Sequence, residues 1–339
     1  MEKRTLKTLI PVCILCAALL TGCGAETAEL TFLAMDTVMS VSVYGRDASA
    51  AAGSCRDEVE RLESLLSVTD ENSEIYAINH AQGQPVAVSE ETAELLARAL
   101  ELCGITGGAL DITVYPVVRA WGFTTGEYRV PDGDELTRLL ENVDYTRVEL
   151  ENGAVTLPEG FQLDLGSVAK GYTADRLTAL LEDAGVESAL LDLGHNIQLI
   201  GSRPDGNDWN IAVQSPQGEG YAGVLSVSDC AVVTSGGYER CFTDENGVTH
   251  HHIIDPATGQ SADSALASST IIGPSGLVCD ALSTAVYVMG AERASQLWRE
   301  LGDFEMVLIT DDGGILVTEG IAGSFTPSSE SAQVTVISR

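Results

Sequence analysis

The sequence predicts an α+β fold in which mixed or antiparallel sheets pack against helices. Three observations point to this class. Segments of strand character outnumber helical segments, several of them come in pairs around an Asn-Gly turn, and the helical segments carry apolar residues on one face. With 339 residues, 45% hydrophobic residues and 34 glycines, the chain is long enough for one large globular domain or two modest ones.

The N-terminus carries the features of an export signal. Lys3, Arg4 and Lys7 form a basic stretch, and an apolar run follows over residues 9–20. This run is too short to span a bilayer, but it matches the apolar part of a signal peptide. We therefore predict that residues 1–22 are a signal peptide that the mature protein lacks.

The signal ends in "LLTGCG", which resembles a bacterial lipobox with Cys23 as the lipid acceptor. Acyl chains on Cys23 would anchor the mature protein, as a lipoprotein, to the outer face of the bacterial cell membrane. Residues 23–29 would then form a lipidated tether. The alternative is a cleaved soluble signal followed by a chance cysteine.

Charge and cysteine content exclude several classes of protein. The net charge of −32 argues against any nucleic-acid role, because a phosphate backbone would be repelled. Five cysteines remain after removal of the signal and acylation of Cys23, and no two have C-x-x-C spacing. An odd number without such a pair favours buried free thiols over a disulfide framework or a zinc site. These cysteines are Cys55, Cys103, Cys230, Cys241 and Cys279.

The elements of the first half follow from apolar periodicity and turn residues. Residues 30–45 alternate well enough for a first strand, and residues 49–67 place apolar side chains at helical spacing. Another helix is predicted over residues 90–102, with Ser89 as its N-cap. Residues 145–160 show two strand-like runs around an Asn-Gly turn, which predicts a hairpin.

The second half shows the same signals. An amphipathic helix over 167–185 ends at Gly185 and leads into a strand of buried type at 188–194. A second Asn-Gly hairpin is predicted over 238–254. Two more helices are predicted at 276–290 and 292–301, and two more strands at 305–310 and 314–320. We predict a folded domain over 30–330, either as one unit or as two intertwined subdomains, followed by a C-terminal tail at 331–339.

The stretch "LDLGSVAKGYTADRL" indicates an anion site. An apolar strand is predicted to end at Asp164, a Gly-Ser turn follows, and a helix begins. A helix start exposes unpaired backbone N–H groups and the positive end of the helix dipole, and Lys170 adds a cation on the first turn. The spacing is not that of a Walker A loop. The alternative is an ordinary strand-turn-helix junction.

A second stretch, "GPSGLVCDALSTAVYVMG", predicts a magnesium site. Asp280 and Thr284 are four residues apart in a predicted helix and therefore share a face. An acid among apolar neighbours is costly to bury unpaired, and a hard cation would offset that cost. Carboxylate and hydroxyl or carbonyl oxygens are ligands of the kind that Mg²⁺ takes. The alternative is that Asp280 begins the helix and faces solvent.

Two further stretches are weaker by themselves. In "THHHIIDPATG", a strand would turn His250 and His252 to one side and His251 to the other. No third zinc ligand can be placed nearby, so one histidine that acts as an acid or base, or that contacts phosphate, is favoured over zinc. In "TGGALDITVYPVVRAWGF", Gly107-Gly108 permits a close backbone approach to a ligand, and Asp111 closes the loop.

Nine short stretches occur in one order along the chain. They are "AMDTVMSV", "NSEIYAIN", "GGALDITVYPVV", "LDLGSVAKGYTAD", "LLDLGHNIQLIG", "WNIAVQSP", "VVTSGGYER", "HHIIDPATG" and "CDALSTAVYVMG". In this order they closely resemble the ApbE family of flavin transferases, over nearly the whole mature chain. The resemblance implies Mg²⁺-dependent cleavage of FAD, transfer of FMN to a threonine or serine hydroxyl of an acceptor protein as a phosphoester, and release of AMP. Implied acceptors are subunits of membrane redox pumps or exported flavoproteins.

The resemblance also implies roles for single residues. Asp280, Thr284 and Ser167 match the metal ligands of the family, and Asp280 is therefore also catalytic. His252 matches a histidine near the phosphates, which implies proton transfer or phosphate binding. The positions that match FAD contacts are Met35, Ala109, Leu110, Asp111, Asp164, Lys170 and Ile254.

Some positions depart from the family pattern. Thr69 stands where many members have a tyrosine that packs near the flavin, and Asp36 and His195 stand where glycines are common. Ser167 follows Gly166 where the family reads Gly-Gly. The departures at Thr69 and His195 keep two alternatives open, an FAD-binding lipoprotein and an FAD pyrophosphatase that forms FMN and AMP without transfer to protein. A generic solute-binding lipoprotein would explain the export signal but not the Asp280/Thr284 pair.

Overall fold

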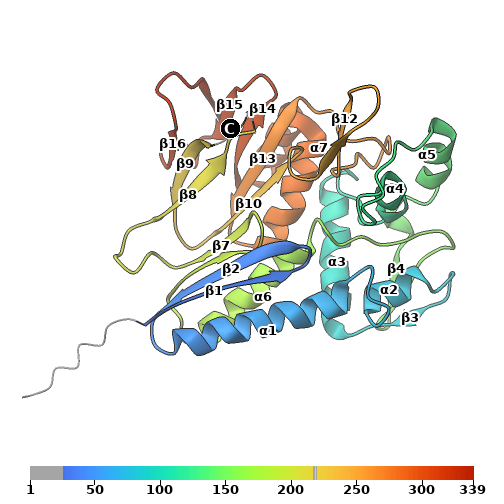
Figure 1. Cartoon of the computed structure of the whole chain (residues 1–339), viewed down its shortest axis with the longest axis horizontal. Coiled ribbons are helices and arrows are strands. Elements are labelled where there is room, and N and C mark those ends of the chain that lie inside the picture. Colours follow the sequence, from blue (N-terminus) through green and yellow to red (C-terminus); the bar gives the residue numbers. More distant parts are fainter. Residues whose placement is uncertain (1–25, 217, 219) are drawn as a thin grey trace, which may run out of the picture.

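The computed structural model describes residues 26–216, 218 and 220–339. A nine-stranded sheet runs through the molecule (Figure 1). Neighbouring strands pair antiparallel except at one end, where β15 and β17 are parallel, so the sheet is mixed. In sheet order its strands are β1 (Thr27–Ala34), β2 (Thr37–Tyr44), β6 (Ser188–Asp192), β7 (Asn196–Ile200), β10 (Ala231–Gly236), β13 (Leu266–Gly273), β14 (Glu305–Thr310), β15 (Ile315–Thr318) and β17 (Val334–Ile337).

Three smaller sheets complete the strand content. Two of them are the predicted Asn-Gly hairpins, which the structure confirms, and the third packs its apolar side chains against one face of the main sheet. The strands are β3 (Val86–Ala87), β4 (Glu149–Glu151) and β5 (Ala154–Thr156) in the first, β11 (Cys241–Thr243) and β12 (Thr249–His251) in the second, and β8 (Trp209–Gln214), β9 (Tyr221–Val227) and β16 (Phe325–Pro327) in the third.

Three long helices cover the other face of the main sheet (Figure 1). They are α1 (Ala48–Leu66), α6 (Ala169–Asp183) and α7 (Gly276–Leu301). The two helices predicted over 276–290 and 292–301 are confirmed: they are the two parts of α7 and meet at a kink at Gly290, where the backbone is non-helical, with φ 75° and ψ 169°. A side chain at Gly290 would meet the carbonyl oxygen of Ser264 at 3.0 Å, so the kink leaves room for that loop.

A second group of helices, short except for α3, lies beside these. Helices α2 (Glu74–Asn79) and α3 (Glu90–Ile105) and the 3₁₀ turn η1 (Tyr145–Arg147) pack with α1 and the start of α7. Helices α4 (Tyr115–Trp121) and α5 (Gly133–Leu140) pack against each other in a separate apolar cluster. The predicted N-cap of α3 is confirmed, because the Ser89 side chain accepts a hydrogen bond from the Thr92 amide. Helix and sheet content together confirm the α+β class.

The structure corrects four predictions. The single strand predicted over 30–45 is a hairpin of β1 and β2, which turns at Met35 and Asp36 with φ values of 47° and 59°. Neither is glycine, so the turn carried no sequence signal. Thr27 already belongs to β1 and residues 334–337 form β17, so the predicted tether and tail both contain sheet strands. No strand ends at Asp164; the segment forms only an isolated bridge between Val114 and Gln162.

The cysteines and the hydropathy of the helices add two points. All five are free thiols, as predicted; Cys55, Cys103 and Cys279 are buried, whereas Cys230 is partly buried and Cys241 is exposed. Over the described residues, no helix combines the length and apolar character that crossing a membrane requires.

Helices α6 and α7 cross closely because glycines meet at the crossing. A side chain at Gly171 of α6 would lie 2.2 Å from the carbonyl oxygen of Gly276. The Asp175 carboxylate of α6 accepts hydrogen bonds from the Ser275 hydroxyl and from the first amides of α7, at Gly276 and Leu277. One side chain of α6 therefore caps α7 and fixes where its first two turns lie.

We expect Asp175→Ala to lower the free energy of unfolding by about 2 kcal/mol, because it removes charge-assisted hydrogen bonds and leaves buried amides without acceptors. Burial raises the pKa of Asp175. Asp175→Asn keeps one acceptor oxygen and should lose less. Urea unfolding of the three proteins at neutral pH measures the difference, and equal midpoints would contradict this account of the cap.

Candidate functional site

A cavity of about 550 Å³ opens where the main sheet, α6 and α7 meet the group of short helices. Its walls come from the β1–β2 turn, the loop before α4, the turn before α6, the turn between β6 and β7, and the segments that follow β10 and β12. The structure brings all eleven predicted ligand and metal residues to this cavity: Met35, Ala109, Leu110, Asp111, Asp164, Ser167, Lys170, His252, Ile254, Asp280 and Thr284. Cys23 lies outside the described residues.

Asp280 lies at the floor of the cavity on the second turn of α7. It is only 3% exposed, and its Oδ2 atom accepts a hydrogen bond of 2.8 Å from the Gly171 amide on α6. Burial raises the pKa of its carboxyl, and Lys170, the Gly171 amide and the nearby Asn196 amide oppose that rise. The predicted solvent-facing alternative for Asp280 is therefore wrong, since the residue is buried.

The residues around Asp280 fit an oxygen-bound divalent cation. Thr284 lies one turn further along α7, with its hydroxyl 3.4 Å from that of Ser235, and Ser167 lies half-buried in the turn before α6. The Asn196 side chain is fully buried beside them, and neither its oxygen nor its nitrogen has a hydrogen-bond partner. A buried carboxylate, hydroxyls and an orphaned amide form the kind of oxygen-rich set that Mg²⁺ binds.

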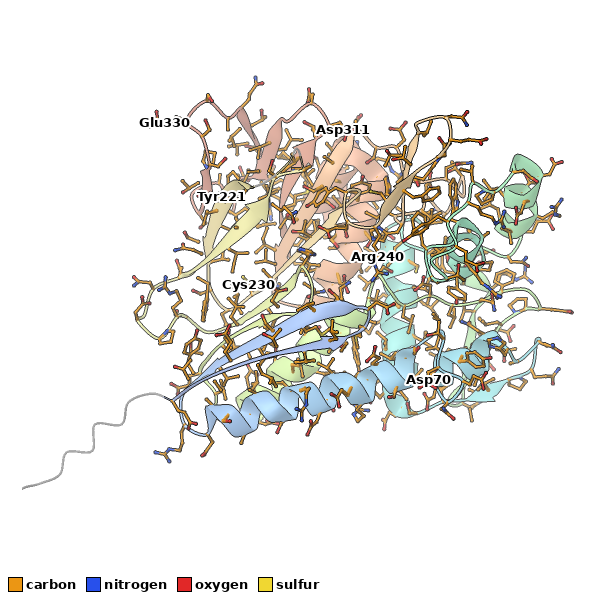
Figure 2. All side chains as sticks on the ribbon, in the orientation of Figure 1. Asp70, Tyr221, Cys230, Arg240, Asp311 and Glu330 are labelled. Carbon is orange, nitrogen blue, oxygen red and sulfur yellow. The ribbon has the colours of Figure 1, made fainter. Side chains whose placement is uncertain are left out.

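Two basic side chains face the same cavity. Burial raises the pKa of Asp164 and of Asp280; Lys170, on the first turn of α6, opposes this rise in both, and Arg240 (labelled in Figure 2) opposes it in Asp164. Burial lowers the pKa of His252, and Arg240 and Lys170 lower it further. Neither forms an ion pair with any carboxylate of the described residues. The chain has 50 acidic residues and only 18 lysines and arginines, so two such cations in one cavity indicate an anion site.

The three consecutive histidines have separate environments. The His250 ring lies 3.3 Å from the Asp244 carboxylate, and the His251 ring lies 3.1 Å from the Ala262 carbonyl oxygen. His252 follows β12 and lines the cavity, and both its amide and its Nδ1 face the Arg240 carbonyl oxygen, at 3.0 and 3.3 Å. Of the three, His252 is therefore the one positioned to meet a ligand.

Burial, the charges of Arg240 and Lys170, and His251 lower the pKa of His252 from 6.5 to about 4. Between these values the unfolded chain binds a proton that the folded chain does not, so this residue makes stability fall as the pH drops through that window. We expect the wild type to lose more unfolding free energy than His252→Gln between pH 7 and pH 4.5. Urea unfolding at the two pH values tests this, and equal losses would contradict an imidazole that stays neutral in the folded protein.

The predicted FAD-contacting residues include several that brace loops. The Asp111 carboxylate accepts hydrogen bonds from the Thr113 amide and hydroxyl at 2.8 and 2.6 Å, and from the Tyr145 amide at 3.0 Å. It closes the loop, as predicted, and so presents the backbone of Ala109 and Leu110 to the cavity. The Met35 amide donates to Glu63 at 2.7 Å, and Asp164 accepts from the Gly166 amide at 2.7 Å.

Comparison with known proteins assigns the chain to a family. The model of the ApbE family matches residues 35–308. The chain belongs to the ApbE family. It is 36% identical to the FAD:protein FMN transferase of Treponema pallidum, over 91% of this chain and 92% of that protein, and 32% identical to the FAD:protein FMN transferase of Vibrio cholerae, over 91% and 95%.

Solved structures of ApbE proteins share the fold. The ApbE protein of Thermotoga maritima superposes with a TM-score of 0.83 and 31% identity, covering 88% of this chain and 99% of that one. The flavin transferase ApbE from Vibrio cholerae superposes with a TM-score of 0.79 and 28% identity, again over 88% and 99%.

The positions that depart from the ApbE pattern all line the cavity. His195 has a φ of 65°, its side chain is 56% exposed, and its Nδ1 lies 3.7 Å from the Glu239 carboxylate. It therefore stands at the cavity mouth and not at the floor. The Thr69 hydroxyl lies 3.1 Å from that of Ser67, so its side chain is held by its own loop. Asp36 is part of the β1–β2 turn.

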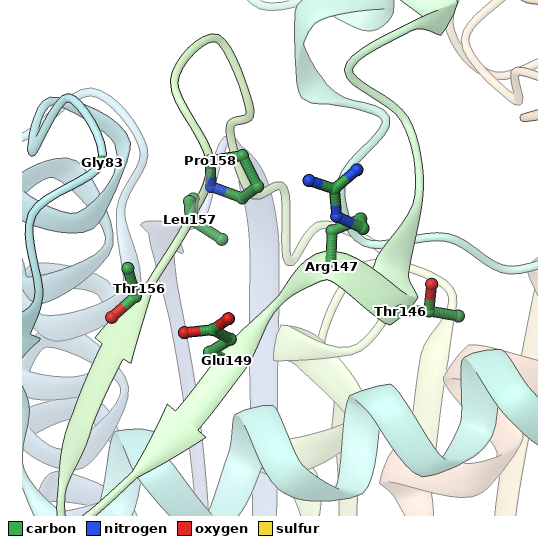
Figure 3. A pocket seen from close by; sticks show the side chains of 7 residues that line it. All are labelled: Gly83, Thr146, Arg147, Glu149, Thr156, Leu157 and Pro158. Atoms are coloured by element: carbon green, nitrogen blue, oxygen red, sulfur yellow. The ribbon is translucent and has the colours of Figure 1, made fainter.

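The cavity-lining residues that sequence reasoning did not select include the polar or charged residues Asn196, Ser235, Glu239 and Arg240. All four fall within or directly beside stretches that carry the family resemblance, but their residue types alone gave no reason to select them. A separate depression of about 210 Å³ involves none of these residues (Figure 3). It is lined by Gly83, Thr146, Arg147, Glu149, Thr156, Leu157 and Pro158.

Proposed function

We propose that this protein is a Mg²⁺-dependent FAD:protein FMN transferase. It moves FMN from FAD to a serine or threonine hydroxyl of an acceptor protein and releases AMP. The observation that carries the proposal is a single cavity in which Asp280 and Thr284 lie together with two cations, Lys170 and Arg240, that form no ion pair within the part of the chain that the structure describes. Membership of the ApbE family and the similarity to proteins named FAD:protein FMN transferase support it.

The chemistry follows from the charges of the cavity. Asp280, Thr284 and Ser167 would hold Mg²⁺, which when bound supplies charge neutralisation at the pyrophosphate. Lys170 and Arg240 bind the phosphate oxygens. The rest of FAD is contacted by Met35, Asp164, Ile254 and the loop from Ala109 to Asp111.

His252 is the proposed general base. Its Nδ1 donates to the Arg240 carbonyl oxygen, so Nε2 is left as the proton acceptor. The acceptor hydroxyl oxygen attacks the phosphorus of the FMN half, and its proton passes to Nε2. The bond from that phosphorus to the bridging oxygen breaks, and AMP leaves with the electron pair. The low pKa of His252 in the free protein keeps the ring neutral at neutral pH, and bound phosphate raises that pKa.

The lipobox supports a location on the outer face of the bacterial cell membrane, with Cys23 as the lipid anchor. Strand β1 begins at Thr27, so three residues (24–26) separate the proposed anchor from the sheet, and the four steps from Cys23 to Thr27 reach about 14 Å at most. The enzyme would therefore act close to the membrane surface. Redox-pump subunits and exported flavoproteins are acceptors that such an enzyme can reach.

One experiment tests the function. Purified mature protein is mixed with FAD, Mg²⁺ and a domain that bears an acceptor threonine. The proposal predicts flavin fluorescence that stays on the acceptor after denaturation, together with one AMP for each flavin transferred. FMN and AMP without labelled acceptor would indicate a pyrophosphatase, and intact bound FAD would indicate a flavin carrier.

A further inference from the structure

Asn196 is the first residue of β7 and follows a turn in which Gly194 and His195 both have positive φ. Side chains alternate between the two faces of a strand. Leu199 packs in the core between the main sheet and the sheet of β8, β9 and β16, whereas Ile200 packs in the core between the main sheet and helices α1 and α6. Asn196 lies four residues before Ile200 and therefore on the same face of the strand, so its side chain points toward the helices. It reaches the cavity that Asp280 of α7 lines from the opposite side.

Several buried side chains of the described residues have one polar atom without a partner, among them Gln198, Ser268 and Trp298, but only Asn196 has two. The Thr234 and Thr270 hydroxyls pair at 2.8 Å, and the Ser235 and Ser283 hydroxyls also pair at 2.8 Å. Asn196 is 0% exposed, yet neither Oδ1 nor Nδ2 makes a hydrogen bond. A buried amide without hydrogen-bond partners costs free energy of folding. A ligand in the cavity that supplied the missing partners would offset this cost.

The surroundings of Asp280 show what those partners are. Its Oδ2 atom is held by the Gly171 amide. Helix α7 packs against β7, and Asn196 and Asp280 line the same cavity, although their side chains do not form a hydrogen bond. The Asp280 carboxylate, on the helix that packs against β7, is therefore the charged acceptor beside the unpaired Nδ2.

We propose that Asn196 is a positioning residue for the cation site: Nδ2 donates to the Asp280 carboxylate, and Oδ1 accepts from water bound to the cation. The carboxylate is then held from α6 by Gly171 and from the sheet by Asn196, so its orientation is set before the cation arrives. Side chains that hydrogen-bond to a metal ligand, without binding the metal themselves, orient that ligand and strengthen metal binding. This inference rests on the proposed metal site.

Asn196→Leu tests the role, because leucine has a similar size and no polar atoms. Gln198→Leu is the matched control, since Gln198 lies two residues along the same strand, is 4% exposed, has an unpaired Oε1 and does not line the cavity. Both variants remove a buried unpaired amide group, so both should melt at or above the temperature of the wild-type apoprotein. Asn196→Ala serves as a second variant should the leucine disturb the fold.

Mn²⁺ binding to the mature protein, followed by electron paramagnetic resonance, is the readout apart from activity. We expect folded Asn196→Leu or Asn196→Ala to bind Mn²⁺ about 10- to 100-fold more weakly than wild type, with Gln198→Leu unchanged. AMP release should then need correspondingly more Mg²⁺. Wild-type affinity in both folded Asn196 variants would overturn the inference and leave the proposed function standing. A wild-type protein that binds no Mn²⁺ would overturn the metal site and this inference together.

Discussion

Asp280→Ala is expected to lower the rate of AMP release from FAD by about 10³-fold or more. The variant lacks the one buried carboxylate proposed to hold the cation, so the transition state loses several kcal/mol of charge neutralisation. Asp280→Asn keeps the shape of the side chain and an oxygen that can accept from Gly171. It should be nearly as inactive, which would separate the need for charge from the need for the hydrogen bond. AMP is measured by chromatography at saturating FAD over a series of Mg²⁺ concentrations.

Thermal stability of the variants shows whether a loss of activity comes from unfolding. Burial raises the pKa of Asp280, so the ionised carboxylate does not stabilise the apoprotein and Asp280→Asn should melt no lower than the wild type. Loss of activity would then not reflect unfolding. Wild-type turnover in either folded variant would remove Asp280 from the site.

Gly171→Ala should weaken both the fold and the site. An added side-chain carbon would lie 2.2 Å from the Gly276 carbonyl oxygen and 2.6 Å from the Asp280 Cβ atom, so α6 and α7 must separate. Overpacking of this kind costs about 1–3 kcal/mol of unfolding free energy. The separation would also lengthen the hydrogen bond from the residue 171 amide to Asp280, so we expect weaker Mn²⁺ binding and slower AMP release.

Gly53→Ala is the matched control, since Gly53 lies within α1 and an added carbon there would meet no atom within 4 Å. It should stabilise the protein by about 0.5–1 kcal/mol through the higher helix propensity of alanine. Thermal and urea unfolding of both variants measure the contrast. A Gly171→Ala protein as stable and as tight for Mn²⁺ as the wild type would show that the crossing tolerates a side chain.

The sequence was most informative where the signal is local. Ser89 predicted the start of α3, and two Asn-Gly pairs predicted the hairpins β4–β5 and β11–β12, because capping and turn geometry depend on residues within one turn of each other. The β1–β2 turn has non-glycine residues at positive φ and was therefore missed. Strand β17 was missed as well, because its pattern of exposed residues shows no buried face.

For the candidate site, the spacing of Asp280 and Thr284 and the order of nine family motifs were enough to name the residues that the cavity brings together. Three features of the cavity were decided only by the tertiary structure: the hydrogen bond between Gly171 and Asp280, the unpaired amide of Asn196, and the placement of Arg240 beside His252 and Lys170. The physical reason is distance along the chain. Gly171 and Asp280 are 109 residues apart, and no local periodicity encodes a contact that forms only when two helices cross over a sheet.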